Sequence, residues 1–152
     1  MRDAIGGIVN IQIILVFIVL VSGYLAFSVN YTKAFRAKNK VINAIEQYEG
    51  VTGNDALDEG GEVWCYFNGC PDIKGIGYKA DRVQCPSGYT LHSLGFCWKE
   101  TKVDVGNTSL DKRYYSVRTF VNIDIPIIEF ILDRLPFFKV DGDTKMIITH
   151  KK

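Results

Sequence analysis

The stretch GGIVNIQIILVFIVLVSGYLAF, residues 6–27, decides what kind of chain this is. Residues 5–27 contain no charge, and three polar residues interrupt them: Asn10, Gln12 and Ser22. A helix that spans a bilayer needs about 20 predominantly apolar residues. A cleaved secretory signal has a shorter apolar core, and a buried soluble helix is rarely apolar on every face over this length. The stretch therefore predicts a membrane helix that the protein retains.

The apolar pattern continues beyond residue 27 with the period of an amphipathic helix. Apolar residues recur at steps of three, four and seven, at Tyr31, Ala34, Phe35, Val41, Ile42, Ile45 and Tyr48. No proline occurs before Pro71, and Gly50 is suited to end a helix. We therefore expect one helix over residues 8–49, roughly 60 Å long, with a lipid-like first half and a stalk that carries one apolar stripe.

The composition leaves room for one compact domain in addition to this helix. The chain has 152 residues, with 18 basic and 17 acidic side chains. Because these charges nearly cancel, no strongly basic surface indicates a nucleic-acid partner. We expect three parts: a leader at residues 1–7, the transmembrane and stalk helix at 8–49, and an exported β-rich domain at 50–152.

Two signals disagree on the orientation of the membrane helix. Four basic residues follow the span directly, and the positive-inside rule places such residues in the cytoplasm; they are Lys33, Arg36, Lys38 and Lys40. The four cysteines lie within 33 residues of one another, outside the apolar stretch, and suggest disulfides formed in an oxidising exterior. We favour the cysteine signal, because basic residues on a helical stalk can have other uses.

The four cysteines allow disulfides or a zinc site. Zinc ligands usually come in close pairs, and the spacing from Cys85 to Cys97 is too long for one. Among the three possible disulfide connectivities we favour Cys65–Cys70, which encloses an Asn-Gly turn, together with Cys85–Cys97. Each disulfide would contribute roughly 2–4 kcal/mol to a small domain.

The remainder of the chain predicts an antiparallel, β-rich domain with one short helix, and so an α+β fold. Alternation is clearest over residues 113–125, where Tyr115, Val117, Thr119, Val121, Ile123 and Ile125 share one face. A short helix is expected over 126–136. For 137–150, one long strand with a bulge or kink at Gly142 is favoured over a hairpin, because it keeps Phe138, Val140, Thr144, Met146 and Ile148 on one face. Weaker strands are expected near Val63–Phe67, Tyr78–Cys85 and Gly95–Val105.

No arrangement of residues predicts an enzyme, a cofactor or a metal site. The two histidines, His92 and His150, are far apart, and neither lies in a nucleophile motif. We expect surface roles for both. The glycines of the chain lack the strand-loop-helix setting of a phosphate-binding loop.

Two parts of the sequence resemble a known family. The leader MRDAIGG, followed by IVNIQIILVFIVLV, resembles the class III signal of type IV prepilins and pseudopilins. Residues 113–147, with a strand, the segment IPII, an apolar segment and a last strand, are similar to TadE-like pseudopilins of tight-adherence (Tad) pili. The resemblance implies a pilin-like fold and cleavage by a prepilin peptidase after Gly7, before Ile8.

One residue departs from the family pattern. The family carries glutamate at the fifth position of the mature chain, and here that position is Gln12. A glutamine can form hydrogen bonds between helices but cannot form the glutamate's ion pair with a neighbouring N-terminal amine. This difference favours a minor or tip subunit over a major one.

The expected function is therefore structural. We expect a membrane-stored minor pilin or pseudopilin that contacts other pilin-like subunits through residues 8–49. Six residues of that helix are the candidates for these contacts: Asn10, Gln12, Tyr31, Phe35, Ile42 and Ile45. Its location would be the cell membrane, with an extracytoplasmic C-terminal domain, or an extracellular pilus filament. The alternative is a single-pass receptor or sensor with an extracytoplasmic ligand-binding domain.

Overall fold

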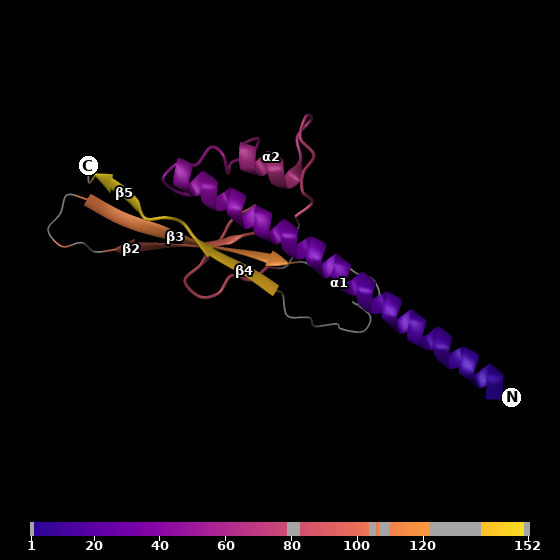
Figure 1. Cartoon of the computed structure of the whole chain (residues 1–152). Coiled ribbons are helices and arrows are strands. Elements are labelled where there is room, and N and C mark those ends of the chain that lie inside the picture. The colour runs from indigo at the N-terminus through magenta and orange to yellow at the C-terminus, as the bar shows by residue number, and fades with distance from the viewer. Residues whose placement is uncertain (1, 79–82, 104–105, 107–109, 122–137, 151–152) are drawn as a thin grey trace. The chain divides into compact units, whose positions relative to one another are not determined.

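The computed structural model describes residues 2–78, 83–103, 106, 110–121 and 138–150 (Figure 1). The chain divides into two compact units. The first consists of Met1–Tyr31 and Ile123–Pro136, and the second of Thr32–Asn122 and Phe137–Lys152.

In the described residues, a long helix is followed by a short helix and five strands. Helix α1 spans Arg2–Gln47, and α2 spans Glu62–Asn68. The strands are β1 (Thr90–Leu91), β2 (Cys97–Val103), β3 (Leu110–Val121), β4 (Phe138–Asp143) and β5 (Ile147–His150). These elements confirm the predicted α+β class, with a long N-terminal helix and an antiparallel sheet.

Helix α1 ends close to the predicted position, but its cap differs from the predicted one. The backbone N–H of Gly50 donates to the carbonyl of Ile45 at 3.1 Å, which closes the last turn in a Schellman-type pattern. The residue in the left-handed conformation is Glu49, with φ of 58°, and not the glycine that follows it. The guanidinium of Arg113 donates to the carbonyl oxygen of Glu49 at 3.2 Å and so supports this strained position.

The sheet has the order β1-β2-β3-β4, and every pairing is antiparallel. Strand β5 pairs with the first residues of β3, from Leu110↔His150 to Arg113↔Ile147. Since β2 already occupies one side of those β3 residues, β5 lies on the same side of β3 as β4. The last two strands therefore follow one another along a single edge, which is the continuous arrangement favoured over a hairpin.

The irregularity between these strands lies beyond Gly142, which pairs with Val117 in regular register. Ser116 pairs with Asp143 and Arg113 pairs with Ile147, so three residues (144–146) face only two (114–115). This extra residue is a β-bulge, and it reverses which side chains face the core.

The predicted faces of this last segment are accordingly wrong after the bulge. Val140 and Thr144 are buried as expected, but Met146 and Ile148 are 50% and 53% exposed. Ile147 is buried in their place. A side chain takes part in the hydrogen bonding of the bulge: the backbone N–H of Tyr115 donates to Thr144 Oγ1 at 2.9 Å.

The core of the second unit lies between α1 and one face of the sheet. Helix α1 contributes small and β-branched side chains that are at most 6% exposed: Ala34, Ala37, Val41, Ala44 and Ile45. The alternating residues of β3 predicted to share one face are buried there: Tyr115, Val117, Thr119 and Val121. The last two residues predicted for that face, Ile123 and Ile125, lie outside the described residues. Alanines at two successive turns of the helix allow its backbone to approach the sheet closely.

Residues 63–67 form part of helix α2 and not the strand expected there. Val, Trp, Tyr and Phe favour strands, but Val63 and Phe67 are four residues apart and are buried together on one side of the helix. Glu62 lies in the first turn, where its charge is favourable, and Gly69 ends the helix with φ of 90°.

The other weak strand predictions have mixed outcomes. The strand expected near Gly95–Val105 exists as β2. At the segment expected over Tyr78–Cys85, the described residues Tyr78 and 83–85 are not in a strand. The short helix expected over 126–136 lies outside the described residues.

Candidate assembly surface

The first part of α1 exposes apolar side chains on all sides of the helix. Over residues 9–22 every residue is exposed: Phe17 and Leu20 are 65% and 66% exposed, and the least exposed large residue of this range, Val21, is 40% exposed. The helix is long and apolar enough to cross a membrane by length and composition. The polar residues Asn10 and Gln12 are exposed within this part, and the backbone of Gly7 and Ile8 is helical. This coarser feature, a candidate membrane span, agrees with the sequence.

The apolar stripe of the stalk separates into two sets of residues. Ile45 is fully buried against its own domain, and Ile42 is half-buried. In the second unit Phe35 is 42% exposed, and in the first unit Tyr31 is 45% exposed. Ile45 therefore serves the fold of its own domain, and the exposed aromatic residues are the ones accessible to a neighbour.

Two of the four basic residues on the stalk have partners within the second unit. The ammonium of Lys40 forms an ion pair with Glu62 and lies 5.9 Å from the centre of the Tyr66 ring. The ammonium of Lys38 lies 4.5 Å from the centre of the Phe35 ring. Basic residues that have such contacts within their own chain are weaker evidence for a cytoplasmic position under the positive-inside rule.

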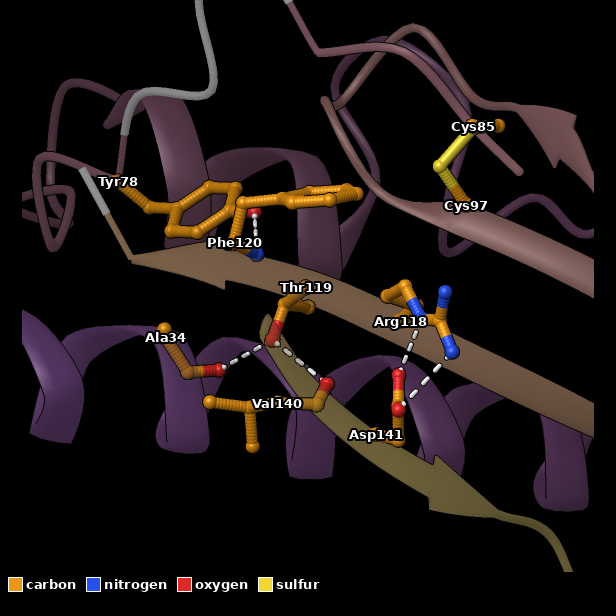
Figure 2. Close-up of polar contacts among 9 residues, drawn as sticks. All are labelled: Ala34, Tyr78, Cys85, Cys97, Arg118, Thr119, Phe120, Val140 and Asp141. Carbon is orange, nitrogen blue, oxygen red and sulfur yellow. Dashed lines mark hydrogen bonds and ion pairs between the residues drawn. A yellow bond between two sulfur atoms is a disulfide. The ribbon is translucent and has the colours of Figure 1, made fainter. Parts of the chain in front are cut away.

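Two residues that the sequence did not single out hold α1 in place. Thr119 is fully buried, and its hydroxyl donates to the carbonyl of Ala34 at 2.9 Å (Figure 2). The carbonyl of Val140 is a second, more distant acceptor for the same hydroxyl, at 3.4 Å. Asn54 is 1% exposed, and its amide donates to the carbonyls of Ala44 at 3.2 Å and Gly50 at 2.8 Å. Asn54 could have been recognised as a turn residue, whereas a threonine in a strand carries no signal for such a contact.

The structure pairs the cysteines as Cys65–Cys70 and Cys85–Cys97, the connectivity that the sequence favoured, with no free cysteine. Because the four sulfur atoms are joined in pairs, they do not form the alternative zinc site. In the described part of the chain, no group of three or more potential ligand side chains is placed to hold a metal ion.

Tyr78, which lies in the segment before Cys85, is on the face of the sheet opposite α1. The hydroxyl of Tyr78 donates to the carbonyl of Gly95 at 3.1 Å and accepts the backbone N–H of Phe120 at 2.9 Å. Figure 2 shows Tyr78 and Phe120 on the same side of β3, and the disulfide Cys85–Cys97 ties the same segment to β2. Burial raises the pKa of Tyr78 to about 12.

The loop inside the second disulfide is also held by charge. The guanidinium of Arg118 pairs with Asp141 through two hydrogen bonds, one of them Nη2 to Oδ2 at 3.0 Å (Figure 2). The same guanidinium lies 5.1 Å from the centre of the Tyr89 ring. This arrangement, together with the disulfide, gives the loop between Cys85 and Cys97 a fixed position on the sheet.

The surface role expected for His92 needs correction. Its ring stacks on Phe96 at 4.6 Å between centres, and its Nδ1 accepts the backbone N–H of Leu94 at 3.3 Å. Burial lowers the pKa of His92, which favours the neutral ring that this hydrogen bond requires. His92 therefore stabilises the turn between β1 and β2. His150 lies in β5, and its side chain is outside the described part of the structure.

Comparison of the chain with models of known families, with curated proteins and with solved structures found no match. The function is therefore inferred from the physical properties of the helix and of the domain attached to it.

Proposed function

We propose that this protein is a structural subunit, a minor pilin or pseudopilin of a type IV-like (Tad-type) pilus, stored in the membrane and assembled through its N-terminal helix. The observation that carries the proposal is the change along α1. Residues 9–22 expose apolar side chains on every side, and the second part of the helix buries one face in a disulfide-bonded domain. A helix of this kind suits a subunit that can exchange lipid for neighbouring helices.

The physical basis of assembly is the contact that replaces lipid. Lipid tails are as apolar as the side chains of the helix, so the hydrophobic effect contributes little to pairing there. Close packing and polar links between helices must contribute instead, and Asn10 and Gln12 are exposed for this purpose. Because Gln12 carries no charge, it supports a minor or tip position better than a major one.

Fewer residues of the stalk are accessible to a neighbouring subunit than the apolar stripe in the sequence indicates. Tyr31 and Phe35 are accessible, whereas Ile45 is buried in its own subunit. The loops closed by the two disulfides would supply any binding specificity, because their backbone is held in place while some of their side chains, among them Asn68, Ser87 and Leu91, are exposed. The disulfides favour an extracytoplasmic position for the domain.

The first experiment is mass spectrometry of the N-terminus of protein purified from native membranes. A mature chain beginning at Ile8 is expected, since a prepilin peptidase cuts after the glycine that precedes the apolar helix. An intact Met1 in cells with an active prepilin peptidase would oppose the proposal and favour the single-pass receptor.

A second experiment tests the assembly surface directly. A photo-crosslinking amino acid at Val16, which is 60% exposed, should form covalent ladders of subunits in membranes and in sheared filaments. The matched control places the same group at Ala37, which is fully buried in its own domain, and should form none. Monomer alone at both positions would exclude assembly through the helix.

A further inference from the structure

Lys33 and Arg36, the first two basic residues after the apolar part of α1, are in no ion pair within the described part of the chain. Within the part of the chain that the structure describes, Lys40 is paired with Glu62, and the other ion pairs involve residues of the sheet and Glu46. No such pair includes Lys33 or Arg36. Arg36 is exposed, and the ammonium of Lys33 lies beside Gly77, 3.8 Å from where a Cβ on that glycine would be.

The spacing of these two residues places them together on the helix. Residues three apart are neighbours on a helical surface, so Lys33 and Arg36 present their charges to the same side. Lys33 follows Phe27, the last residue of the uncharged stretch, by six residues, which is about 9 Å of helix. Arg36 follows it by nine residues, about 13 Å of helix.

Both backbone positions lie beyond the headgroup layer of a bilayer, but side chains on a helix point toward its N-terminus, here toward the membrane. The headgroup region on each side is roughly 5–7 Å thick, and long basic side chains extend their charged ends toward it. A guanidinium binds phosphate oxygens with two parallel hydrogen bonds, and an ammonium adds a compact positive charge. A lipid phosphate offers the complementary charge at that depth of a membrane.

We propose that Lys33 and Arg36 form a binding site for the phosphate of an anionic lipid headgroup. This inference rests on the proposed function to the extent that α1 must be held in a membrane. The site fixes the depth of the stalk while the subunit is stored, and a neighbouring subunit must compete with the lipid for these two charges.

The test is a lipid titration of the full chain in mild detergent micelles, followed by native mass spectrometry. The lipids are phosphatidylglycerol and phosphatidylcholine with the same acyl chains. Phosphatidylglycerol should bind more tightly, by about fivefold for each basic residue that contacts it. Lys33→Gln and Arg36→Gln should each reduce this preference about fivefold, Arg36→Lys should retain part of it, and the double variant should abolish it.

The matched control is Lys102→Gln, which removes the same charge from an exposed position on β2 and should leave the preference unchanged. Equal binding of the two lipids, or equal losses in Lys102→Gln and Arg36→Gln, would overturn the proposal. Near-ultraviolet circular dichroism of each variant establishes that the domain is folded.

Extraction of membranes at alkaline pH separates this inference from the proposed function. A chain that leaves the membrane under this treatment has no spanning helix, and both proposals then fail. A chain that stays in the membrane but shows no headgroup preference refutes the lipid site alone.

Discussion

Thr119 offers a sharp test of how α1 is held on the sheet. Its side chain is fully buried, and its hydroxyl donates to the helix carbonyl of Ala34. Three substitutions separate the contributions of the hydroxyl and of the methyl group. Thr119→Val keeps the shape and removes the donor, Thr119→Ser keeps the donor and removes the methyl group, and Thr119→Ala removes both.

The magnitudes follow from what each variant leaves behind. In Thr119→Val the carbonyl of Ala34 keeps its acceptor role within the helix, so no buried acceptor is left unpaired and the loss is about 1 kcal/mol. In Thr119→Ser the loss of one packed methyl group also amounts to about 1 kcal/mol. Thr119→Ala should therefore lose about 2 kcal/mol of unfolding free energy.

The assay is urea unfolding of the full chain in detergent micelles, followed by the fluorescence of Trp64 and Trp98. Thr101→Val is the control, because Thr101 is only half-buried and lies on the opposite face of the sheet. Its effect should be within about 0.5 kcal/mol of zero. Amide hydrogen exchange should show faster opening of residues 34–45 in Thr119→Val.

One pattern of results would refute this reasoning. If Thr119→Val is as stable as the wild type and protects residues 34–45 equally, then the hydroxyl contributes nothing to docking. Apolar packing alone would then hold the helix at Thr119, and only Thr119→Ser and Thr119→Ala would be destabilised.

Three further predictions concern the backbone and pH. Gly61→Ala places a Cβ 2.2 Å from the backbone oxygen of Asp55 and should lose about 3 kcal/mol in urea unfolding, whereas Gly60→Ala has open space but a φ of 84° and should lose about 1–2 kcal/mol. Equal losses would contradict the clash. Glu49→Gly relieves a left-handed residue with φ of 58° and should raise stability by up to about 1 kcal/mol; a lower melting temperature would oppose this. Because the pKa of Tyr78 is raised from 10.0 to about 12, the folded state favours the protonated phenol. Its contribution is complete below pH 10 and falls by about 1.4 kcal/mol per pH unit up to about pH 12. Tyr78→Phe should flatten this part of the stability profile, and an unchanged slope would assign the loss to another group.

The sequence predicted the features that depend on local periodicity and strong composition signals. The long helix, the alternation of β3 and the favoured cysteine pairs are of this kind. It also predicted that the last segment follows a single edge, because the apolar residues remain in phase across Gly142. In the helix and in β3 one apolar pattern extends over many residues. In the first cysteine pair a short, turn-like spacing favours the pairing.

The failures occur where a single residue or a long-range contact decides the outcome. One extra residue at the bulge reverses the faces of Met146 and Ile148, and no apolar pattern marks its position. Helix α2 was expected as a strand because β propensity depends on tertiary context, and Val63 and Phe67 bury together only in a helix. The apolar stripe shows which residues of the helix are apolar, but not which of them face the sheet. The burial of Ile45 in its own domain therefore could not be predicted.

The bulge has a consequence for the free edge of the sheet. A regular, apolar edge strand invites the edge of another molecule to pair with it and so begins aggregation. Here the bulge interrupts the edge, and the backbone N–H of Lys145 is occupied by the carboxylate of Glu46 on α1 at 2.8 Å. Charged residues also line β4, among them Lys139, Asp141 and Asp143. This edge of the sheet is thereby protected from pairing with another sheet, which agrees with the proposed association through the helix.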